Sequence, residues 1–360
     1  MRKLLNKFVY KEKKRRRDRA LKAYMSSQES IAPLTKEEEA KVKAMWGVFG
    51  LPFNTGWHRY FKHMSGSFDE RCIPQDIWNL FEISLNTPAY RDALQHKVLC
   101  YKILPSEVFP TPLGAIVHGV ALGNDLRPCS HDDLESNLAN EGKVVMKVAG
   151  FTGGGKGVRL IDFSKMTKEE LKAFVQKAIA DNNDYIFQKV LKISEELKRF
   201  NPPSTNTVRV VTLNINGRAT LASSFLRMAT DDRLNDNAGA GGTMVAVHPD
   251  GQLHHFGVDN PMAERRLCSP TGLVFAETRL ESYQRLVDRL LSLHEQIPYM
   301  GFIAWDATID EEGEIRVIEL NLDSQEMECH QAFNGPLFGD RTQEVIDHVL
   351  KQKIKRVKVF

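Results

Sequence analysis

One segment constrains the fold of this chain more than any other: Gly301–Asp323, with the sequence GFIAWDATIDEEGEIRVIELNLD. Its apolar and polar residues alternate in a way that predicts two strands, Phe302–Ile309 and Glu314–Leu322. The Asp-Glu-Glu-Gly sequence between them is typical of a tight turn. We therefore expect an antiparallel strand pair with one apolar face.

Three polar side chains of this strand pair are candidate metal ligands. Asp306 lies on one face of the first strand, and Glu319 and Asn321 share a face of the second, whereas their apolar neighbours point the other way. Such a surface suits Mg²⁺, because this ion prefers oxygen ligands and takes only one or two carboxylates beside water and substrate phosphates. A solvated face of an ordinary hairpin is the alternative, and this segment alone does not decide between them.

Length and composition are those of a globular protein. The 360 residues suffice for two or three lobes, and 42% of them are hydrophobic and 26% charged. No apolar run reaches the roughly 20 residues needed to cross a bilayer, and the basic start of the chain lacks a signal-peptide pattern. We expect a cytoplasmic protein without a transmembrane segment.

The cysteines and the net charge narrow the function further. The five cysteines are widely spaced and include no Cys-x-x-Cys pair, which argues against a disulfide framework or a zinc site. A net charge of +3 does not indicate a nucleic-acid partner. Basic residues gather in Lys11–Arg19 and Lys351–Lys358. We expect Lys11–Arg19 to form a solvated helix surface, and the alternative is that this segment contacts anionic lipid at a membrane surface.

A glycine-rich loop follows a predicted strand, Lys143–Lys147, that is apolar up to its final lysine. The loop contains three glycines and a lysine: Gly153, Gly154, Gly155 and Lys156. Consecutive glycines let backbone N–H groups turn toward an anion. The spacing is not that of a P-loop, because no Gly-x-x-x-x-Gly-Lys-Ser/Thr is present. A flap over phosphates and a merely flexible hairpin are both open, and the preceding lysine favours the flap.

Two arginines lie on a predicted hairpin whose turn, Asn216-Gly217, is the strongest hairpin signal in the chain. A regular two-residue turn places Arg209 opposite Ser224. Arg209 and Arg227 then lie on opposite faces unless a bulge intervenes. Only one of them would reach a given ligand directly, and the sequence does not say which.

Other patterns predict further helices and strands. The start of a helix is expected at Thr35, with Glu38 completing a capping box. Later helices are expected at Arg91–Leu104, Lys168–Asn182, Thr278–Gln296 and Thr342–Lys353. Strands are expected at Gly114–Val120 and Tyr185–Leu191.

The order of these motifs resembles the ATP-grasp superfamily, and in detail its sugar-transfer-associated branch. The motifs that carry the resemblance are the strand ending at Lys147, the loop Gly153–Val158, the strand Gln188–Leu191, the segment Ser204–Thr212, Asp236-Asn237 with Gly241-Gly242, and Trp305-Asp306 followed by Glu319-Leu320-Asn321. The resemblance covers roughly residues 68–340.

The resemblance implies an α+β fold in which ATP lies between two lobes. It divides the chain into a helical N-terminal region, residues 1–67, and three further parts. These are an N-terminal lobe at residues 68–140, a small lobe with the glycine flap at 141–192, and a large lobe with the metal site at 193–360.

The resemblance also implies roles for single residues. Lys97 and Lys147 would contact the ATP phosphates, and Gly153, Gly154, Gly155 and Lys156 would close over them. The other implied contacts are Gln188, Lys189 and Leu191 with adenine, Glu196 with ribose, Arg209 or Arg227 with the transferred phosphate, Asn237 nearby, and Asp306, Glu319 and Asn321 with Mg²⁺.

The implied activity is ATP- and Mg²⁺-dependent ligation of a carboxylate to an amine or related nucleophile through an acyl phosphate. A sugar or cell-surface polysaccharide precursor is one expected acceptor. A phosphotransferase and a non-catalytic nucleotide-binding scaffold are alternatives, and the presence of all three candidate metal ligands argues against the scaffold. Ala304 and Leu322–Gln325 replace an arginine and a Pro-Gly turn of D-alanine-type ligases, so a different acceptor is expected.

Overall fold

The computed structural model describes the chain except for residues 1–17, 20, 28–30, 151–156, 231–241, 260–264, 324 and 357–360. Side chains are described as far as residue 352. None of the described helices is long and apolar enough to span a bilayer.

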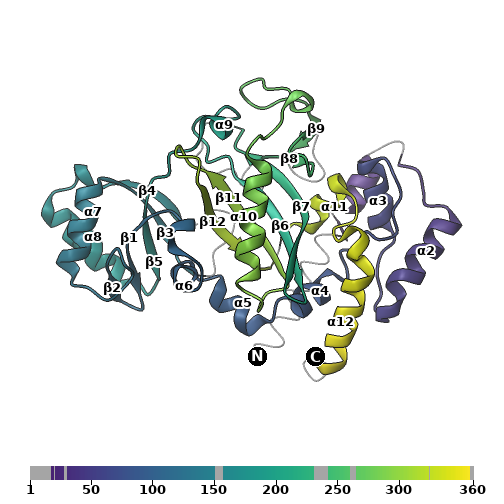
Figure 1. The fold of residues 1–360 in the computed structure, drawn as a ribbon, viewed down its shortest axis with the longest axis horizontal. Helices are drawn as coiled ribbons and strands as arrows, with labels where there is room; N and C mark the ends of the chain where they lie inside the picture. The colour runs from purple at the N-terminus through teal and green to yellow at the C-terminus, as the bar shows by residue number, and fades with distance from the viewer. Residues whose placement is uncertain are drawn as a thin grey trace.

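Two antiparallel sheets form the framework of the molecule (Figure 1). The smaller sheet has the strand order β2-β1-β5-β3-β4, and the larger has the order β10-β9-β8-β7-β6-β11-β12. The smaller consists of β1 (Pro112–Val117), β2 (Val120–Leu122), β3 (Lys143–Val148), β4 (Val158–Asp162) and β5 (Tyr185–Lys189). The larger consists of β6 (Val208–Ile215), β7 (Arg218–Met228), β8 (Thr243–Val247), β9 (Leu253–Val258), β10 (Arg265–Arg266), β11 (Phe302–Ile309) and β12 (Ile315–Asn321).

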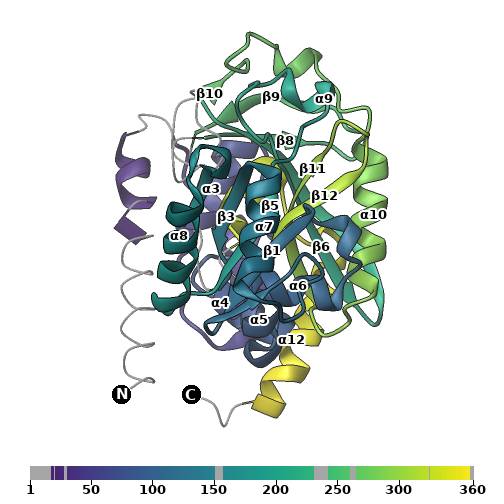
Figure 2. The same cartoon turned by 90° about the vertical axis from the view of Figure 1, so that its left-hand side faces the viewer.

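Helices cover both sheets and link them. The N-terminal half contributes α2 (Lys36–Trp46), α3 (Gly56–Ser65), α4 (Trp78–Leu85), α5 (Pro88–Leu94), α6 (Lys97–Ile103), α7 (His131–Glu141) and α8 (Lys168–Ala180). The C-terminal half contributes α9 (Glu195–Lys198), α10 (Tyr283–Glu295), α11 (Met327–Asn334) and α12 (Thr342–Arg356). Figure 2 shows α7 and α8 in front of the smaller sheet, and Figure 1 shows α2 and α3 at the other end of the molecule, near α11.

The larger sheet is held on one face by α10. Leu290 of this helix and Trp305 of β11 are buried in one apolar cluster. The Trp305 indole N–H donates to Thr212 Oγ1 at 2.8 Å, and Nδ1 of the buried His294 lies 2.6 Å from the same hydroxyl. This packing fixes β6 and β11 side by side, and Arg209 and Asp306 lie on the opposite face.

The predicted strand pair is present as β11 and β12. Asp306 pairs with Glu319, and Ala304 pairs with Asn321. Because opposed residues of an antiparallel pair share a face, the three candidate metal ligands do lie on one surface. The predicted capping box at Thr35 is also confirmed, since its hydroxyl accepts from Glu38 N–H while the Glu38 carboxylate accepts from Thr35 N–H.

The single helix predicted at Arg91–Leu104 is wrong. The chain forms α5 and α6 instead, with His96 extended between them. The cause is a tertiary contact: the Lys97 N–H donates to the Ala149 carbonyl at 2.7 Å rather than to a carbonyl of a continuing helix. This contact ties the start of α6 to the end of β3.

Two further predicted elements begin or end at different residues in the structure. The strand expected at Gly114–Val120 is divided into β1 and β2, because positive φ angles at His118 and Gly119 reverse the chain. The helix expected from Thr278 begins only at Tyr283, after a segment that is paired with the β8–β9 turn.

A bulge in β7 decides where the two arginines lie. The β6–β7 register shifts between Val211 and Thr212, so Arg209 pairs with Phe225 rather than with Ser224. Arg227 is two residues beyond Phe225 and therefore shares the face of Arg209. The expected placement on opposite faces is wrong for this reason.

The smaller sheet joins strands from both sides of the lobe boundary expected between residues 140 and 141, since β1 pairs with β5. Those two segments therefore share one sheet. The division of the chain into lobes stays a prediction.

Candidate functional site

Two lysines and a glutamate meet where the sheets face each other. Lys97 begins α6, Lys147 lies near the end of β3, and Glu319 is on β12. Lys97 Nζ lies 3.1 Å from Glu319 Oε1. The contact of α6 with the end of β3 brings the two lysines together, although they are far apart in the sequence.

Lys147 is buried, with 7% of its surface exposed, and makes no ion pair within 4.0 Å in the described part of the chain. Burial lowers its pKa to about 8; Glu319 opposes this shift and the nearby Lys97 adds to it. A buried ammonium group that lacks a paired carboxylate is costly. The site therefore favours an anionic ligand.

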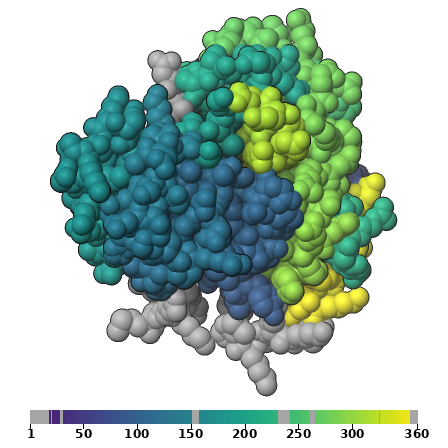
Figure 3. Space-filling model, turned by 60° about the vertical axis from the view of Figure 1, so that its left-hand side comes forward, coloured from purple at the N-terminus to yellow at the C-terminus, as the bar shows by residue number. Residues whose placement is uncertain are grey.

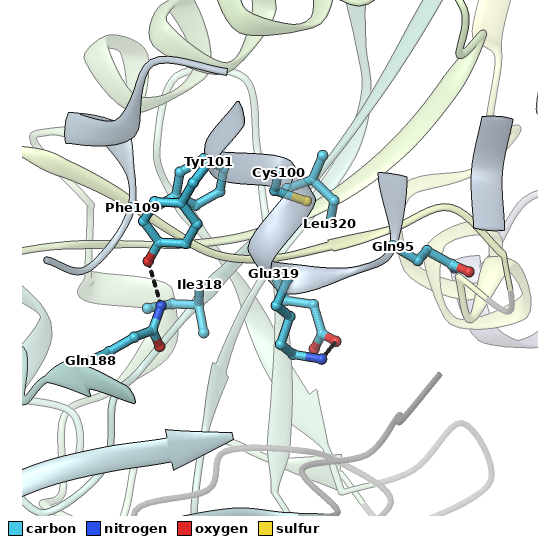
Figure 4. A pocket seen from close by; sticks show the side chains of 9 residues that line it. Gln95, Cys100, Tyr101, Phe109, Gln188, Ile318, Glu319 and Leu320 are labelled. Atoms are coloured by element: carbon cyan, nitrogen blue, oxygen red, sulfur yellow. Dashed lines mark hydrogen bonds and ion pairs between the residues drawn. The ribbon is translucent and has the colours of Figure 1, made fainter. Parts of the chain in front are cut away.

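A cavity opens beside these groups (Figure 4). Its lining combines apolar and polar side chains from α6, β5 and β12, together with Gln95, which follows α5, and Phe109, which precedes β1. The full set is Gln95, Lys97, Cys100, Tyr101, Phe109, Gln188, Ile318, Glu319 and Leu320. In Figure 3 the yellow-green turn between β11 and β12 lies at the surface above the blue segment of α5 and α6. The Arg316 guanidinium donates there to the Glu107 carbonyl, which ties β12 to the segment after α6.

Gln188 presents an unused acceptor to this cavity. The Tyr101 hydroxyl donates to the Pro110 carbonyl at 2.6 Å and accepts from Gln188 Nε2 (Figure 4). Because the hydroxyl hydrogen is committed to a carbonyl, the nitrogen of the Gln188 amide must face Tyr101. Gln188 Oε1 is buried and has no hydrogen-bond partner among the described residues. A ligand with an N–H donor would satisfy it.

The other three residues expected around the base and ribose do not line this cavity among the described side chains. The Lys189 N–H donates to the Thr111 carbonyl at 2.9 Å, and its ammonium pairs with Glu141 at 2.9 Å. Leu191 follows β5 and is half-buried. Glu196 lies on α9 and accepts from Ser282 N–H at 3.2 Å.

A second cluster lies on the same face of the larger sheet. Arg209 donates from Nε to Asp306 Oδ1 at 2.7 Å and from Nη2 to Oδ2 at 2.8 Å. Arg227 Nη1 lies 3.1 Å from the same Oδ2. Burial opposes ionisation of Asp306, but the two guanidinium charges outweigh it and hold the pKa of this carboxyl well below its usual range.

The candidate metal ligands differ in what they offer a cation. The Asp306 carboxylate is held by both arginines, whereas Glu319 pairs only with Lys97 in the described part of the chain. Asn321 Nδ2 donates to Asp306 Oδ2 at 3.1 Å and to the Ala304 carbonyl at 3.3 Å, so its Oδ1 stays available as a ligand. The described residues contain no group of three His, Cys, Asp or Glu side chains arranged for a metal. Two protein oxygens still suit Mg²⁺ when phosphates supply others.

Five predicted site residues lie outside the described residues: Gly153, Gly154, Gly155, Lys156 and Asn237. The strands on either side of the glycine loop are described, and Lys147 pairs with Val158 across them. Two paired strands therefore flank the predicted glycine-rich loop.

The sequence did not point to two residues of this site. Tyr101 orients Gln188 from 87 positions away, and no sequence pattern links them. Glu326 accepts from Arg209 Nη1 at 2.6 Å and has a left-handed backbone, with φ 56°. A left-handed backbone is uncommon for a residue other than glycine, and this feature of Glu326 is visible only in the structure.

Comparison with known protein families shows to which family this chain belongs. A model of the family described as sugar-transfer associated ATP-grasp matches residues 79–347. The chain belongs to that family. The resemblance found from the motifs is therefore confirmed, together with the α+β ATP-grasp fold.

Solved structures similar to this ATP-grasp chain are distant. The ATP-grasp ligase PsnB, complexed with precursor peptide PsnA2 and AMPPNP, is 12% identical, with 74% of this chain and 62% of that chain covered and a TM-score of 0.42. D-alanyl-alanine synthetase A from Vibrio cholerae O1 biovar eltor is 12% identical, with 72% and 65% covered and a TM-score of 0.42. An L-amino acid ligase from Bacillus licheniformis is 15% identical, with 71% and 48% covered and a TM-score of 0.38. The chain thus spans less than two thirds of these proteins. No curated protein sequence matches it.

Proposed function

We propose that this chain is an ATP- and Mg²⁺-dependent ligase that activates a carboxylate as an acyl phosphate and passes the acyl group to an amine or related nucleophile. The observation that carries the nucleotide part is Lys147, a buried ammonium group without an ion pair in the described chain, beside Lys97. A triphosphate would neutralise both amines. ATP as co-substrate agrees with the expected cytoplasmic location.

The cavity would bind the adenine end of the nucleotide. Gln188 Oε1, held in place by Tyr101, would accept from the amino group of adenine. Lys189, at the end of β5, and Leu191, just beyond it, would offer backbone groups to the adenine edge. Glu196 would reach the ribose only after releasing the Ser282 N–H.

Glu319 and Asn321 would hold Mg²⁺ with the phosphates, and Asp306 would be the third protein ligand. Bound Mg²⁺ supplies charge neutralisation to the phosphates, which is the main requirement of phosphoryl transfer. Gly153, Gly154, Gly155 and Lys156 would cover the phosphates from the β3–β4 loop, and Asn237 would approach from the segment between β7 and β8.

Arg209 and Arg227 would stabilise the negative charge on the transferred group. Both guanidinium groups are fixed by Asp306, so little reorganisation is needed when charge develops. Phosphoryl transfer depends on positioning and charge neutralisation more than on a protein nucleophile, which agrees with direct attack by a substrate carboxylate. The acceptor proposed is a sugar-linked or cell-surface precursor, on the basis of the family's description.

Hydroxylamine trapping tests the proposal. The protein is incubated with Mg-ATP, hydroxylamine and a panel of carboxylates, and both ADP and hydroxamate are measured. A ligase yields the two products in equal amounts with the right carboxylate. A stable phosphorylated product without hydroxamate would instead identify a phosphotransferase, and absence of Mg-ATP binding would contradict the nucleotide site itself.

Lys147→Met is the first variant to compare, because it removes the buried ammonium group while keeping a long apolar side chain. Lys165→Met is the matched control, since the Lys165 side chain is 80% exposed and its ammonium group pairs with Asp162 at the surface. We expect loss of Mg-ATP binding in the first variant and wild-type binding in the second.

A further inference from the structure

A histidine that the proposed function does not use lies beside the arginine cluster. His330 is on α11, and 1% of its surface is exposed. Its ring stacks on Phe225, with ring centroids 4.1 Å apart and an angle of 24° between the planes. Phe225 is the register partner of Arg209 and stands two residues before Arg227 on the same face of β7. The imidazole therefore lies on the face of the sheet that carries both guanidinium groups.

Hydrogen bonds around Ser223 determine which ring nitrogen carries the proton. Asn334 Nδ2 lies 3.1 Å from the Ser224 carbonyl, which can only accept, so the amide nitrogen is the donor there. The same nitrogen donates to Ser223 Oγ at 2.8 Å. The Ser223 hydroxyl must then give its own hydrogen to His330 Nδ1, 2.7 Å away, because no other acceptor contacts it in the described chain.

The proton of the neutral ring is consequently on Nε2. Burial and the nearby Arg209 charge lower the pKa of His330 well below its usual value, so the ring stays neutral. Nε2 is buried and has no hydrogen-bond partner among the described residues. A buried N–H donor without an acceptor is costly, which indicates that a ligand satisfies it.

We propose that the His330 Nε2–H group, next to Arg209 and Arg227, binds an anionic oxygen of the reacting substrates. This inference rests on the proposed function and adds to its site a hydrogen-bond donor from α11. Two groups share the required chemistry: the phosphate that is transferred and the carboxylate that receives it. A neutral donor suits either, because it binds the oxygen without competing for the proton.

His330→Phe tests this role, because it keeps a ring on Phe225 and removes the N–H group, together with the Nδ1 acceptor of the Ser223 hydroxyl. His330→Gln is the rescue variant, since its amide can donate from a similar position, and it also serves if the phenylalanine variant does not fold. Binding of Mg-ADP, Mg-AMPPNP, and acetate in the presence of Mg-AMPPNP is measured by calorimetry, with the melting temperature as the check on folding. Inorganic phosphate is titrated into the nucleotide-free protein.

The probes distinguish the two sources of the oxygen. If it belongs to the transferred phosphate, His330→Phe weakens Mg-AMPPNP and inorganic phosphate about 10- to 100-fold, as expected for a hydrogen bond to a charged group, and leaves Mg-ADP unchanged. If it belongs to the carboxylate, acetate binding alone falls. His330→Gln restores most of the loss in either case.

Unchanged affinity of a folded His330→Phe variant for all four probes would overturn the inference. A nitrogen-15 spectrum of the histidine rings gives a second test, because the inference requires protonation at Nε2 of His330 and a proton at Nδ1 would contradict it. If wild-type protein fails to bind Mg-ADP, the proposed function fails, and the phosphate titration and the spectrum still decide the role of His330.

Discussion

Arg209 and Asp306 face each other across β6 and β11 and form an ion pair with two hydrogen bonds, 2.7 Å from Nε to Oδ1 and 2.8 Å from Nη2 to Oδ2. Arg227 joins the same carboxylate from β7. One buried carboxylate therefore fixes two guanidinium groups. The pair therefore stabilises the site and fixes the orientation of the Arg209 guanidinium group.

Asp306→Asn should destabilise the protein strongly. The substitution removes the carboxylate charge that both buried guanidinium groups share, and breaking a buried pair costs about 3–5 kcal/mol. Arg209 keeps its pair with Glu326. Asp259→Asn is the matched control, because Asp259 also receives two hydrogen bonds from one arginine, Arg266, whose side chain is 49% exposed. That change should cost about 1 kcal/mol or less. Urea denaturation measures both, and equal losses would contradict the role of Asp306.

Mg-nucleotide binding should weaken as the pH rises through about 8, the pKa of Lys147. Below this pH the ammonium is charged and attracts phosphate, whereas above it the neutral amine does not. A bound anion raises the pKa of a lysine, so binding near pH 8 should take up protons. Calorimetry in buffers of different ionisation enthalpy measures this uptake. Lys147→Met should abolish it, and proton release in the wild type would contradict the assignment.

Glu319→Gln should weaken Mg²⁺ binding in the presence of ADP and abolish Mg²⁺-dependent ATP turnover, because it removes the more exposed of the two candidate metal carboxylates, Glu319 and Asp306. The effect on stability should be small, about 1 kcal/mol or less, since the Glu319 side chain is 28% exposed and its pair with Lys97 is partly solvated. Glu311→Gln, which breaks the exposed pair with Lys192, is the control. ATP turnover that survives in Glu319→Gln would remove the proposed metal site.

Tyr101→Phe should reduce the preference of the site for adenine. Without the hydroxyl, the Gln188 amide loses the contact that fixes its orientation, and Oε1 no longer faces the cavity in every molecule. Inosine triphosphate is the probe, because it carries an oxygen where ATP carries the amino group. We expect the wild type to favour ATP about tenfold, as for one hydrogen bond of about 1.4 kcal/mol, and Tyr101→Phe to lose most of that preference. Equal binding of both nucleotides by the wild type would contradict the role of Gln188.

Local patterns predicted the elements that depend only on neighbouring residues. The alternation in Gly301–Asp323 predicted β11 and β12 and the shared face of Asp306, Glu319 and Asn321, because strand geometry repeats every two residues. The capping box at Thr35 and the turn at Asn216-Gly217 are local in the same sense. The order of the motifs was sufficient to identify the family.

Tertiary contacts decided the rest. The bulge in β7 brings Arg227 to Asp306, and a single extra residue in a strand leaves no pattern that marks it. The break between α5 and α6 exists because Lys97 N–H finds the Ala149 carbonyl, and this contact sets Lys97 beside Glu319. The side chains at the site come from strands and helices far apart in the chain. The sequence by itself determined which groups could hold a nucleotide and a metal, whereas register and packing determined which of them meet, because those depend on contacts between residues that are not neighbours.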